Sequence, residues 1–303
     1  AKHRVVLTTA RVVAASAHRD SPSVQMATEK AKVVVMTGAT GVIGEAIAEG
    51  FKTANLMAPT VSRLILICRS AARGEKVAAK LRGSLMKVDV VVADLSSPSS
   101  VSACAAELAA KHPKIDVLVN NAAVVPTRRE ETADGLEMQF AVNVLAYFAL
   151  MRGLLPSMSS GARVVLVASN LAGGLDTSNL QCKGMDPYRA TDVYSRTKQA
   201  NRMLAAEAAM PGRGFAEKGV LVTSCHPGVV TSPLLQNLGF SSGFQPAASG
   251  AQTPLKLALS VPPENGSFWV DKQKTKCKFA SDLAGRQALW EACEALVGGV
   301  SPP

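Results

Sequence analysis

Short runs of β-branched residues alternate with alanine-rich amphipathic stretches from Lys32 onward. A strand-like run followed by a helical stretch is typical of a βαβ unit with parallel strands. The pattern predicts an α/β fold of the Rossmann type: a doubly wound parallel sheet of about seven strands with helices on both faces, in a single domain over residues 31–303. The runs are KVVVMT (32–37), LILIC (64–68), KVDVVVA (87–93), IDVLVN (115–120), ARVVLVAS (162–169) and GVLVTSC (219–225).

Cap and turn residues divide these elements. Ser97 and Pro98 indicate the N-cap and first residue of a helix, and Gly161 is expected to separate a helix from the fifth strand. Glycine, serine and proline concentrate in 228–250, where we expect a mobile flap rather than a domain boundary. The lysine-rich segment 271–278 predicts a solvated hairpin or loop.

Composition excludes several classes of protein. The chain has 303 residues, 48% of them hydrophobic, which is enough for a sizeable core. The net charge is +10, but no basic run is interleaved with aromatic residues, so we expect no nucleic-acid partner. Six cysteines without a CxxC pair and four dispersed histidines predict neither a disulfide framework nor a metal site. The longest apolar run, Phe140 to Met151, is too short to span a bilayer and predicts a core helix.

Residues 1–30 differ from the rest of the chain. They are rich in Arg, Ala, Ser and Val, poor in acids, and lack the apolar block of a secretory signal. We interpret them as a transit-like leader, which predicts an organellar location, a plastid rather than a mitochondrion. The alternative is a flexible basic tail on a cytoplasmic protein.

The first predicted strand leads into a glycine loop, TGATGVIG. Gly38, Gly41 and Gly44 would let the backbone approach a dinucleotide pyrophosphate, and Thr40, Val42 and Ile43 complete the loop and the mouth of the next helix. A tight turn without a ligand is the alternative for such glycines.

The end of the second strand indicates which dinucleotide binds. An NAD site usually places an acid there, but Arg63 to Gly74 contains no Asp or Glu, and Arg69 follows LILIC directly. A guanidinium at this point can pair with a 2′-phosphate, with help from Arg73, so NADP(H) is the predicted cofactor. A solvated surface arginine is the alternative.

In this order, the glycine loop, VVADLSS, LVNNAAV, Asn143, VVLVAS and the Tyr194/Lys198 pair resemble the short-chain dehydrogenase/reductase superfamily. TADGLEMQFAVNVLAYFALMRGLLP, YSRTKQANRMLAAEAA and CHPGVVTSPLL are similar to its retinol-dehydrogenase-like branch, which includes protochlorophyllide reductase relatives. The chain departs from common members at three positions, Val42, Ala146 and Ala168, and none of these removes a reacting group.

The resemblance implies a catalytic tetrad of Asn143, Ser169, Tyr194 and Lys198. Tyr194 would protonate the alkoxide formed by hydride transfer, Ser169 would donate a hydrogen bond to the same oxygen, and Asn143 would order a water that links Lys198 to solvent. An ammonium about 4 Å from a phenolate stabilises it by roughly 4 kcal/mol at an effective dielectric near 20, so we expect Lys198 to lower the pKa of Tyr194. For Asn143, a buried asparagine bonded to backbone is the alternative.

The resemblance also implies further cofactor contacts. Asp94 and Leu95 would border the adenine, Asn121 and Ala122 would line the cofactor cleft, and Pro227, Gly228 and Val229 would set the nicotinamide edge. Asp94 is equally compatible with a turn residue before the Ser97 cap.

Two functions are compatible with these motifs. The first is an NADP(H)-dependent oxidoreductase acting on an apolar carbonyl or alcohol such as a retinoid, isoprenoid, pigment, steroid or lipid. The second is a dinucleotide-binding, largely non-catalytic subunit of an organellar complex, for which the short-chain dehydrogenase of the chloroplast import translocon is a related precedent. The resemblance further implies a homo-oligomer formed through the helices after Asn143 and around Tyr194.

Overall fold

A computed structural model describes residues 31–58, 60–83, 85–260 and 262–298. The predicted leader, residues 1–30, lies outside the described residues. The described residues form one compact unit.

The described residues form an eight-stranded sheet in the order β3-β2-β1-β4-β5-β6-β7-β8. Every neighbouring pair is parallel except β7 and β8, so the predicted doubly wound sheet is confirmed with one strand more than expected. The strand order reverses at β1, which lies between β2 and β4, and parallel sheets of this kind bind ligands at such a switch point. The strands are β1 (Lys32–Thr37), β2 (Val61–Cys68), β3 (Lys87–Val92), β4 (Ile115–Asn120), β5 (Met158–Val167), β6 (Leu221–His226), β7 (Phe268–Val270) and β8 (Gln273–Thr275).

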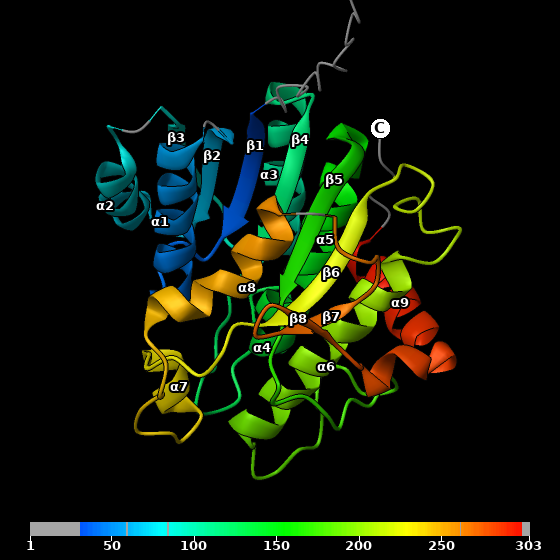
Figure 1. Ribbon diagram of the computed structural model, residues 1–303. Helices are drawn as coiled ribbons and strands as arrows, with labels where there is room; N and C mark the ends of the chain where they lie inside the picture. The colour runs from blue at the N-terminus through cyan, green and yellow to red at the C-terminus, as the bar shows by residue number, and fades with distance from the viewer. Residues whose placement is uncertain (1–30, 59, 84, 261, 299–303) are drawn as a thin grey trace, which may run out of the picture. The chain divides into compact units, whose positions relative to one another are not determined.

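Helices cover both faces of the sheet (Figure 1). Residues of α1, α2 and α8 contribute to the core cluster on one face, and α3, α5, α6 and α9 contribute to the cluster on the other. The α-helices are α1 (Val42–Met57), α2 (Ala71–Leu81), α3 (Pro98–Lys111), α4 (Met138–Phe140), α5 (Ala146–Leu154), α6 (Ala190–Ala208), α7 (Pro233–Asn237), α8 (Ala247–Leu259) and α9 (Leu283–Val297). A π-helical turn, η1 (Ala141–Leu145), joins α4 to α5, and two 3-10 turns, η2 (Leu155–Ser157) and η3 (Lys278–Ser281), complete the described set.

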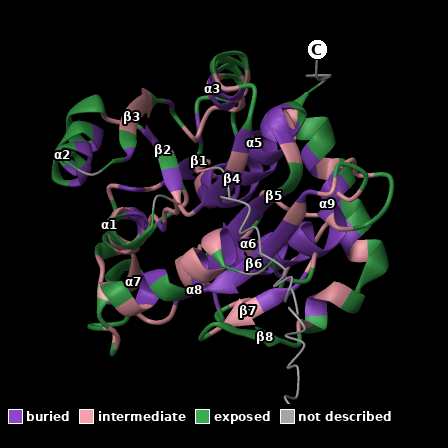
Figure 2. Ribbon diagram, turned by 45° about the horizontal axis from the view of Figure 1, so that its top comes forward, coloured by how far each residue is buried: buried purple, intermediate pink, exposed green. Residues whose placement is uncertain are grey.

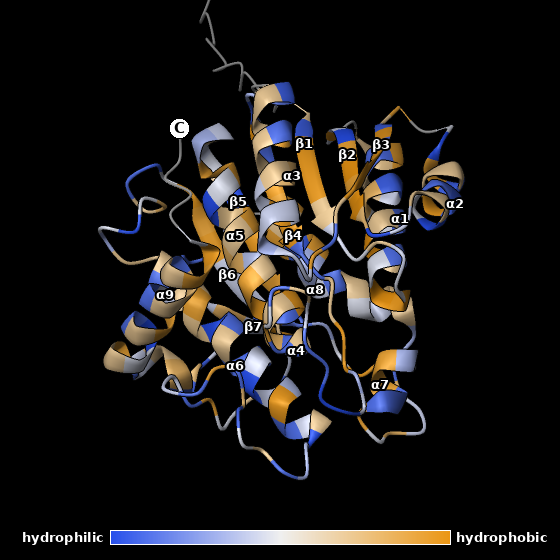
Figure 3. Cartoon of the chain, turned by 180° about the vertical axis from the view of Figure 1, so that it is seen from behind, coloured by the Kyte–Doolittle hydropathy of each residue, from blue (hydrophilic) through white to orange (hydrophobic). Residues whose placement is uncertain are grey.

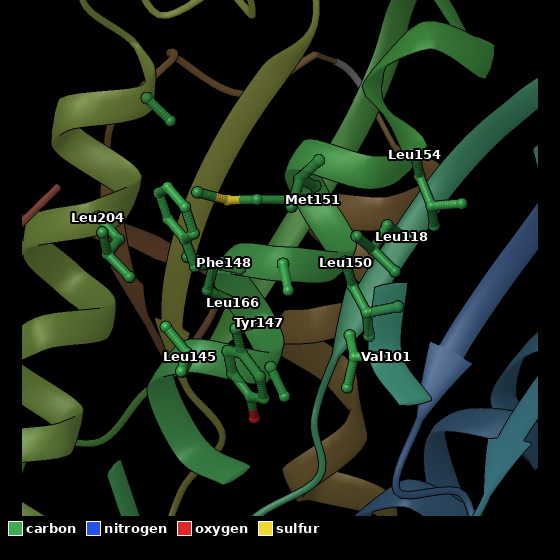
Figure 4. Packing of buried hydrophobic residues seen from close by; sticks show 14 of the residues in the cluster. Val101, Leu118, Leu145, Tyr147, Phe148, Leu150, Met151, Leu154, Leu166 and Leu204 are labelled. Atoms are coloured by element: carbon green, nitrogen blue, oxygen red, sulfur yellow. The ribbon is translucent and has the colours of Figure 1, made fainter. Parts of the chain in front are cut away.

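The sheet is apolar on both faces, as a parallel sheet between two helical layers requires. The hydropathy colouring in Figure 3 shows the strands as the most apolar part of the chain seen from behind. Along β5, Val164 and Leu166 belong to the cluster with α5, whereas Val165 belongs to the opposite cluster, as strand alternation dictates. Figure 4 shows Leu118 and Leu166 of the sheet beneath the side chains of α5.

The apolar stretch Met138–Ser157 is long and apolar enough to cross a membrane by length and composition alone. However, 78% of its most apolar window is buried inside the fold, which agrees with the predicted core helix. Figure 2 shows the same burial along α5.

One predicted boundary was wrong and another was confirmed. Gly161 does not precede the fifth strand but lies inside β5, which begins at Met158. Gly161 has φ +81° and donates to Gly219 O at 2.9 Å, so its left-handed backbone bends the strand rather than ending a helix. The predicted start of α3 is confirmed, with Ser97 at the N-cap and Pro98 as the first helical residue. The Ser97 hydroxyl pairs with Ser99 Oγ at 3.0 Å rather than with the helix backbone.

The segment 271–278 forms the predicted hairpin in part. Asp271 and Lys272 both have positive φ, as a tight hairpin turn requires, and Val270 pairs with Gln273 across it. The strands on either side, β7 and β8, have three residues each, too few for an apolar run to be recognised in the sequence.

Candidate functional site

The carboxyl end of β1 carries the glycine loop. Gly38 has φ +71°, and a Cβ there would lie 2.7 Å from the backbone of Ala122. A Cβ on Gly44 would lie 1.9 Å from Gly38 O, so both glycines are required by close approach of backbone to backbone.

Gly41 has a different role from the other two glycines. A Cβ there would meet only Gly38 O, at 3.5 Å, so the protein leaves open space beside it. Gly41 is the N-cap of α1 and offers no side chain to the first N–H groups of that helix, at Val42, Ile43 and Gly44. This cradle of free N–H groups at a positive helix end fits an anion such as a pyrophosphate.

Asn121 and Ala122 hold the glycine loop in place. The Asn121 side chain donates to Gly38 O at 3.2 Å, and the N–H groups of Asn121 and Ala122 both donate to Thr37 Oγ1 at 3.0 Å. The Asn121 side chain therefore braces the glycine loop, and both residues lie directly beside it.

Arg69 and Asp94 lie close together at the ends of β2 and β3. Ser96 N–H, the Ser96 hydroxyl and the positive charge of Arg69 all lower the pKa of Asp94, with the backbone hydrogen bond as the main cause. Asp94 Oδ1 accepts from Ser96 N at 2.9 Å, so the turn that the sequence left open is present. Arg69 remains exposed beside this carboxylate. Leu95 packs with its side chain against the core.

Arg73 ties α2 to the glycine loop. Its guanidinium donates to Thr40 O at 3.2 Å while the side chain remains exposed. Two exposed arginines, Arg69 and Arg73, therefore follow β2, and Arg73 reaches the glycine loop.

Tyr194, Lys198 and Ser169 converge at the carboxyl ends of β5 and β6. Tyr194 and Lys198 lie one turn apart near the start of α6, and Lys198 Nζ is 5.5 Å from the centre of the Tyr194 ring. Ser169 is the second residue after β5, and its hydroxyl hydrogen bonds to Tyr194. Three of the four predicted catalytic side chains thus form one group.

The pKa values of this pair contradict the expected effect of Lys198. Burial raises the pKa of Tyr194 to about 12, and only the hydrogen bond from Ser169 opposes that shift. Burial also lowers the pKa of Lys198 to about 7, while its Nζ donates to Val167 O at 2.9 Å. Desolvation outweighs the attraction between ammonium and phenolate, because both charged forms are removed from water.

Asn143 lies in the π-helical turn η1 and is fully buried. Its Oδ1 accepts from Val124 N at 2.8 Å, and its Nδ2 donates to Val124 O at 3.0 Å and to Thr197 Oγ1 at 3.4 Å. The side chain thus makes the backbone contacts that the sequence left as an alternative, and it joins the loop after β4 to α6. π-helical turns often mark functional sites.

Pro227, Gly228 and Val229 follow β6 and are held by Gln245. Gln245 Oε1 accepts from Val229 N at 3.1 Å, and a Cβ on Gly228 would lie 1.8 Å from the same oxygen. His226, just before them, accepts from Asn170 N at Nδ1, and burial lowers its pKa to about 4. His226 is therefore neutral and structural.

The segment after Val229 packs over Tyr194. Val125, Tyr194 and Leu238 form a small buried cluster, and Asn237 Nδ2 donates to Val125 O at 2.9 Å. The Thr191 hydroxyl donates to Leu238 O at 3.3 Å. The predicted flap is therefore anchored at two points in this structure.

Sequence reasoning missed four residues that shape the site. Tyr147 is fully buried and donates from its hydroxyl to Ala122 O at 2.8 Å. Tyr147 follows Asn143 by four residues and Arg202 follows Lys198 by four, so the same one-turn spacing was a usable signal. Thr37, at the strand end before the glycines, was also recognisable, whereas Gln245 carried no sequence signal.

The sequence profile described as short chain dehydrogenase matches residues 32–241. The chain belongs to the short-chain dehydrogenase family. It is 33% identical to retinol dehydrogenase 12 of Mus musculus over 283 residues, which cover 88% of this chain and 86% of that protein. It is 34% identical to retinol dehydrogenase 14 of Mus musculus over 298 residues, with the same coverage. This short-chain dehydrogenase is therefore retinol-dehydrogenase-like, as the motifs indicated.

Solved structures share the fold. A crystal structure of an uncharacterized protein from Mycobacterium Paratuberculosis matches with a TM-score of 0.69 and 27% identity, covering 88% of this chain and 93% of that one. A short chain dehydrogenase from Burkholderia cenocepacia J2315, solved in complex with NADP, matches with a TM-score of 0.60 and 21% identity, covering 79% and 95%. The latter supports the fold alone.

Proposed function

We propose that this short-chain dehydrogenase transfers hydride between NADP(H) and an apolar carbonyl or alcohol. The observation that carries the proposal is the convergence of Ser169, Tyr194 and Lys198 beside the glycine cradle, at the carboxyl edge of the sheet. A dinucleotide bound at the cradle would supply the hydride.

The preference for NADP(H) rests on charge. Arg69 is exposed after β2, Arg73 lies one turn further on, and the interval from Arg63 to Gly74 contains no acid. A 2′-phosphate would find two guanidinium groups there, whereas a ribose diol would find no carboxylate at that strand end.

The protein's own residues supply proton transfer and alignment. Tyr194 would protonate the substrate oxygen, and Ser169, whose hydroxyl accepts from Leu171 N at 3.1 Å, would donate to the same oxygen. When Lys198 is protonated, its ammonium would stabilise the tyrosinate that is left after Tyr194 gives up its proton.

Support for an apolar substrate comes from the surroundings of Tyr194. Val125 and Leu238 contact it, Leu234 packs against them, and Phe244 is 82% exposed on the adjoining segment. The relatives named retinol dehydrogenase are consistent with a ligand of this type.

The test is oxidation of NADPH with a panel of aldehydes that includes all-trans-retinal, a steroid ketone and a short polar aldehyde. We expect turnover with the apolar members, and we expect Tyr194→Phe to abolish it while NADPH still binds. Tyr188→Phe is the matched control, because Tyr188 bonds Glu137 and Gln139 away from the cradle. Tight NADPH binding without turnover on any member would instead favour a binding subunit.

We also propose an organellar location, on the composition of residues 1–30. Fusion of these residues to a fluorescent protein should direct it to plastids in plant cells. Diffuse cytoplasmic fluorescence would contradict the proposal.

A further inference from the structure

Ser169 lies just beyond the last hydrogen bond that β5 makes within the sheet. β5 ends at Val167, and Ala168 N donates the last ladder hydrogen bond, to Cys225 O at 2.8 Å. The hydroxyl of Ser169 must nevertheless be held to a fraction of an ångström for its hydrogen bond to contribute to catalysis. Some other group has to fix its backbone.

Arg202 supplies that support. Its Nη2 donates to the carbonyl oxygen of Ser169 and lies 3.4 Å from Asn170 Oδ1. Arg202 stands one turn beyond Lys198 on α6, and Lys198 Nζ donates to Val167 O. Two consecutive cations of α6 therefore hold the carbonyls on either side of Ala168.

The guanidinium of Arg202 is itself held in place by two aromatic rings. Its central carbon lies 3.6 Å from the centre of the Phe268 ring, in β7, and 5.7 Å from that of Phe279. The side chain is only 7% exposed, and burial lowers its pKa from the usual value. A planar cation held against an aromatic face has little freedom to move, so it can hold a backbone oxygen precisely.

Arg202 does not touch the nucleotide cradle, whose described contacts involve Thr37, Asn121, Ala122 and Arg73. Its hydrogen bonds reach the backbone of the serine rather than its hydroxyl. We propose that Arg202 is a positioning residue that acts through Ser169, holding its backbone so that its hydroxyl meets Tyr194. This inference deepens the proposed function and rests on it.

The first experiment needs no turnover. The chain has three tyrosines, so labelling with 13C at the tyrosine Cζ gives a simple NMR spectrum, assigned with Tyr194→Phe. Arg202→Met should shift the Tyr194 resonance in the same direction as Ser169→Ala does. Arg163→Met is the matched control: Arg163 is 6% exposed, donates to Leu257 O, and lies far back along β5, so it should leave the Tyr194 resonance unmoved.

The second experiment uses NADPH oxidation with all-trans-retinal. Arg202→Met should lower kcat about 10- to 100-fold, with the Kd for NADPH changed less than about threefold. Arg202→Lys should recover part of the loss in kcat. An ammonium can still donate to the carbonyl, but it cannot stack on an aromatic ring or donate from a planar, two-pronged group. The Ser169→Ala/Arg202→Met double variant should be no slower than Ser169→Ala alone.

Three outcomes would overturn the proposal: an unmoved Tyr194 resonance in Arg202→Met, an unchanged kcat, or fully additive losses in the double variant. If Arg202→Met does not fold, the same comparisons are made with Arg202→Lys, which keeps the charge. If the wild-type protein shows no turnover, the proposed function fails, and the NMR comparison alone decides the role of Arg202.

Discussion

Lys198 lies with its ammonium 5.5 Å from the centre of the Tyr194 ring, but its hydrogen bond goes to Val167 O. The two side chains are brought together as their spacing predicted, yet burial shifts both pKa values toward the neutral forms. A bound nicotinamide ribose would add hydroxyl groups beside Lys198, which is how the family resemblance accounts for a retained ammonium. The fold therefore brings the two side chains together, while their burial favours the neutral form of each.

The first prediction concerns stability against pH. Burial lowers the pKa of Lys198 from 10.5 to about 7, so between these values the unfolded chain binds a proton that the folded protein has released. Stability should accordingly rise with pH in this window and lose that contribution as pH falls through 7. The thermal melting temperature of the cofactor-free protein, measured at pH 7 and 9, should increase more for wild type than for Lys198→Met.

The window from pH 7 to 9 isolates Lys198 from its neighbours. Burial raises the pKa values of Tyr194 and Cys225 to about 12, from 10.0 and 9.0, so their contributions are lost only at higher pH. Equal melting-temperature changes in wild type and Lys198→Met would show that Lys198 keeps its proton in the folded protein.

The second prediction concerns the choice of cofactor. Arg69→Glu replaces a guanidinium with a carboxylate that would repel a 2′-phosphate and accept a ribose hydroxyl. The KM for NADPH should rise by about 10-fold or more, and that for NADH should change little or fall. Arg82→Glu is the matched control, because Arg82 follows α2 at its other end and pairs with Glu75. Equal changes with both cofactors would refute the assignment.

The third prediction separates two glycines of the cradle. Gly44→Ala places a Cβ 1.9 Å from Gly38 O, and overpacking of this kind costs about 1–3 kcal/mol of stability. Gly41→Ala meets nothing closer than 3.5 Å and should leave the melting temperature nearly unchanged. NADPH affinity should fall in both variants. A Gly41→Ala protein that binds NADPH as wild type does would show that the open space beside Gly41 is not the pyrophosphate position.

The fourth prediction concerns oligomeric state. The resemblance implied a homo-oligomer through the helices after Asn143 and around Tyr194, but α9 packs against them. Trp290 of α9 meets Phe148 of α5 edge-on with ring centres 4.9 Å apart, and fourteen of the 19 residues of α6 are buried. We therefore expect the protein to run at its monomer mass of 31.5 kDa in light scattering after size exclusion. A dimer whose formation protects α5 and α6 from hydrogen exchange would contradict this expectation.

The fold was predictable from the sequence because its strands are short apolar runs at regular intervals. Strands β7 and β8 were not predicted, because three residues are too few to show the alternation of a strand. Gly161 was placed wrongly, because the sequence does not distinguish a glycine inside a strand from one that precedes it. The position of a strand's first residue depends on its partner, here Ile115 opposite Met158, which no local pattern contains.

The candidate site was predictable at the level of residue identity but not of role. Ser169, Tyr194 and Lys198 could be named from motifs because Ser169 lies just past a strand and Tyr194 and Lys198 lie one turn apart on a helix. The bracing function of Asn121 and the burial that governs the Tyr194 pKa depend on neighbours remote in the chain. Neither feature can therefore be derived from a local sequence pattern.

The enclosure of α6 has a consequence for how such enzymes diversify. A helix surrounded by core on nearly every side cannot shift to suit a new ligand, so Tyr194, the proposed proton donor, keeps its position. Adaptation to molecules of different length must then fall to the stretch from Val229 to Gln245, whose Leu238 and Asn237 hydrogen bond to Thr191 and Val125 outside it. Substitutions in that stretch can change which ligand fits while the side chains proposed for the reaction stay in place.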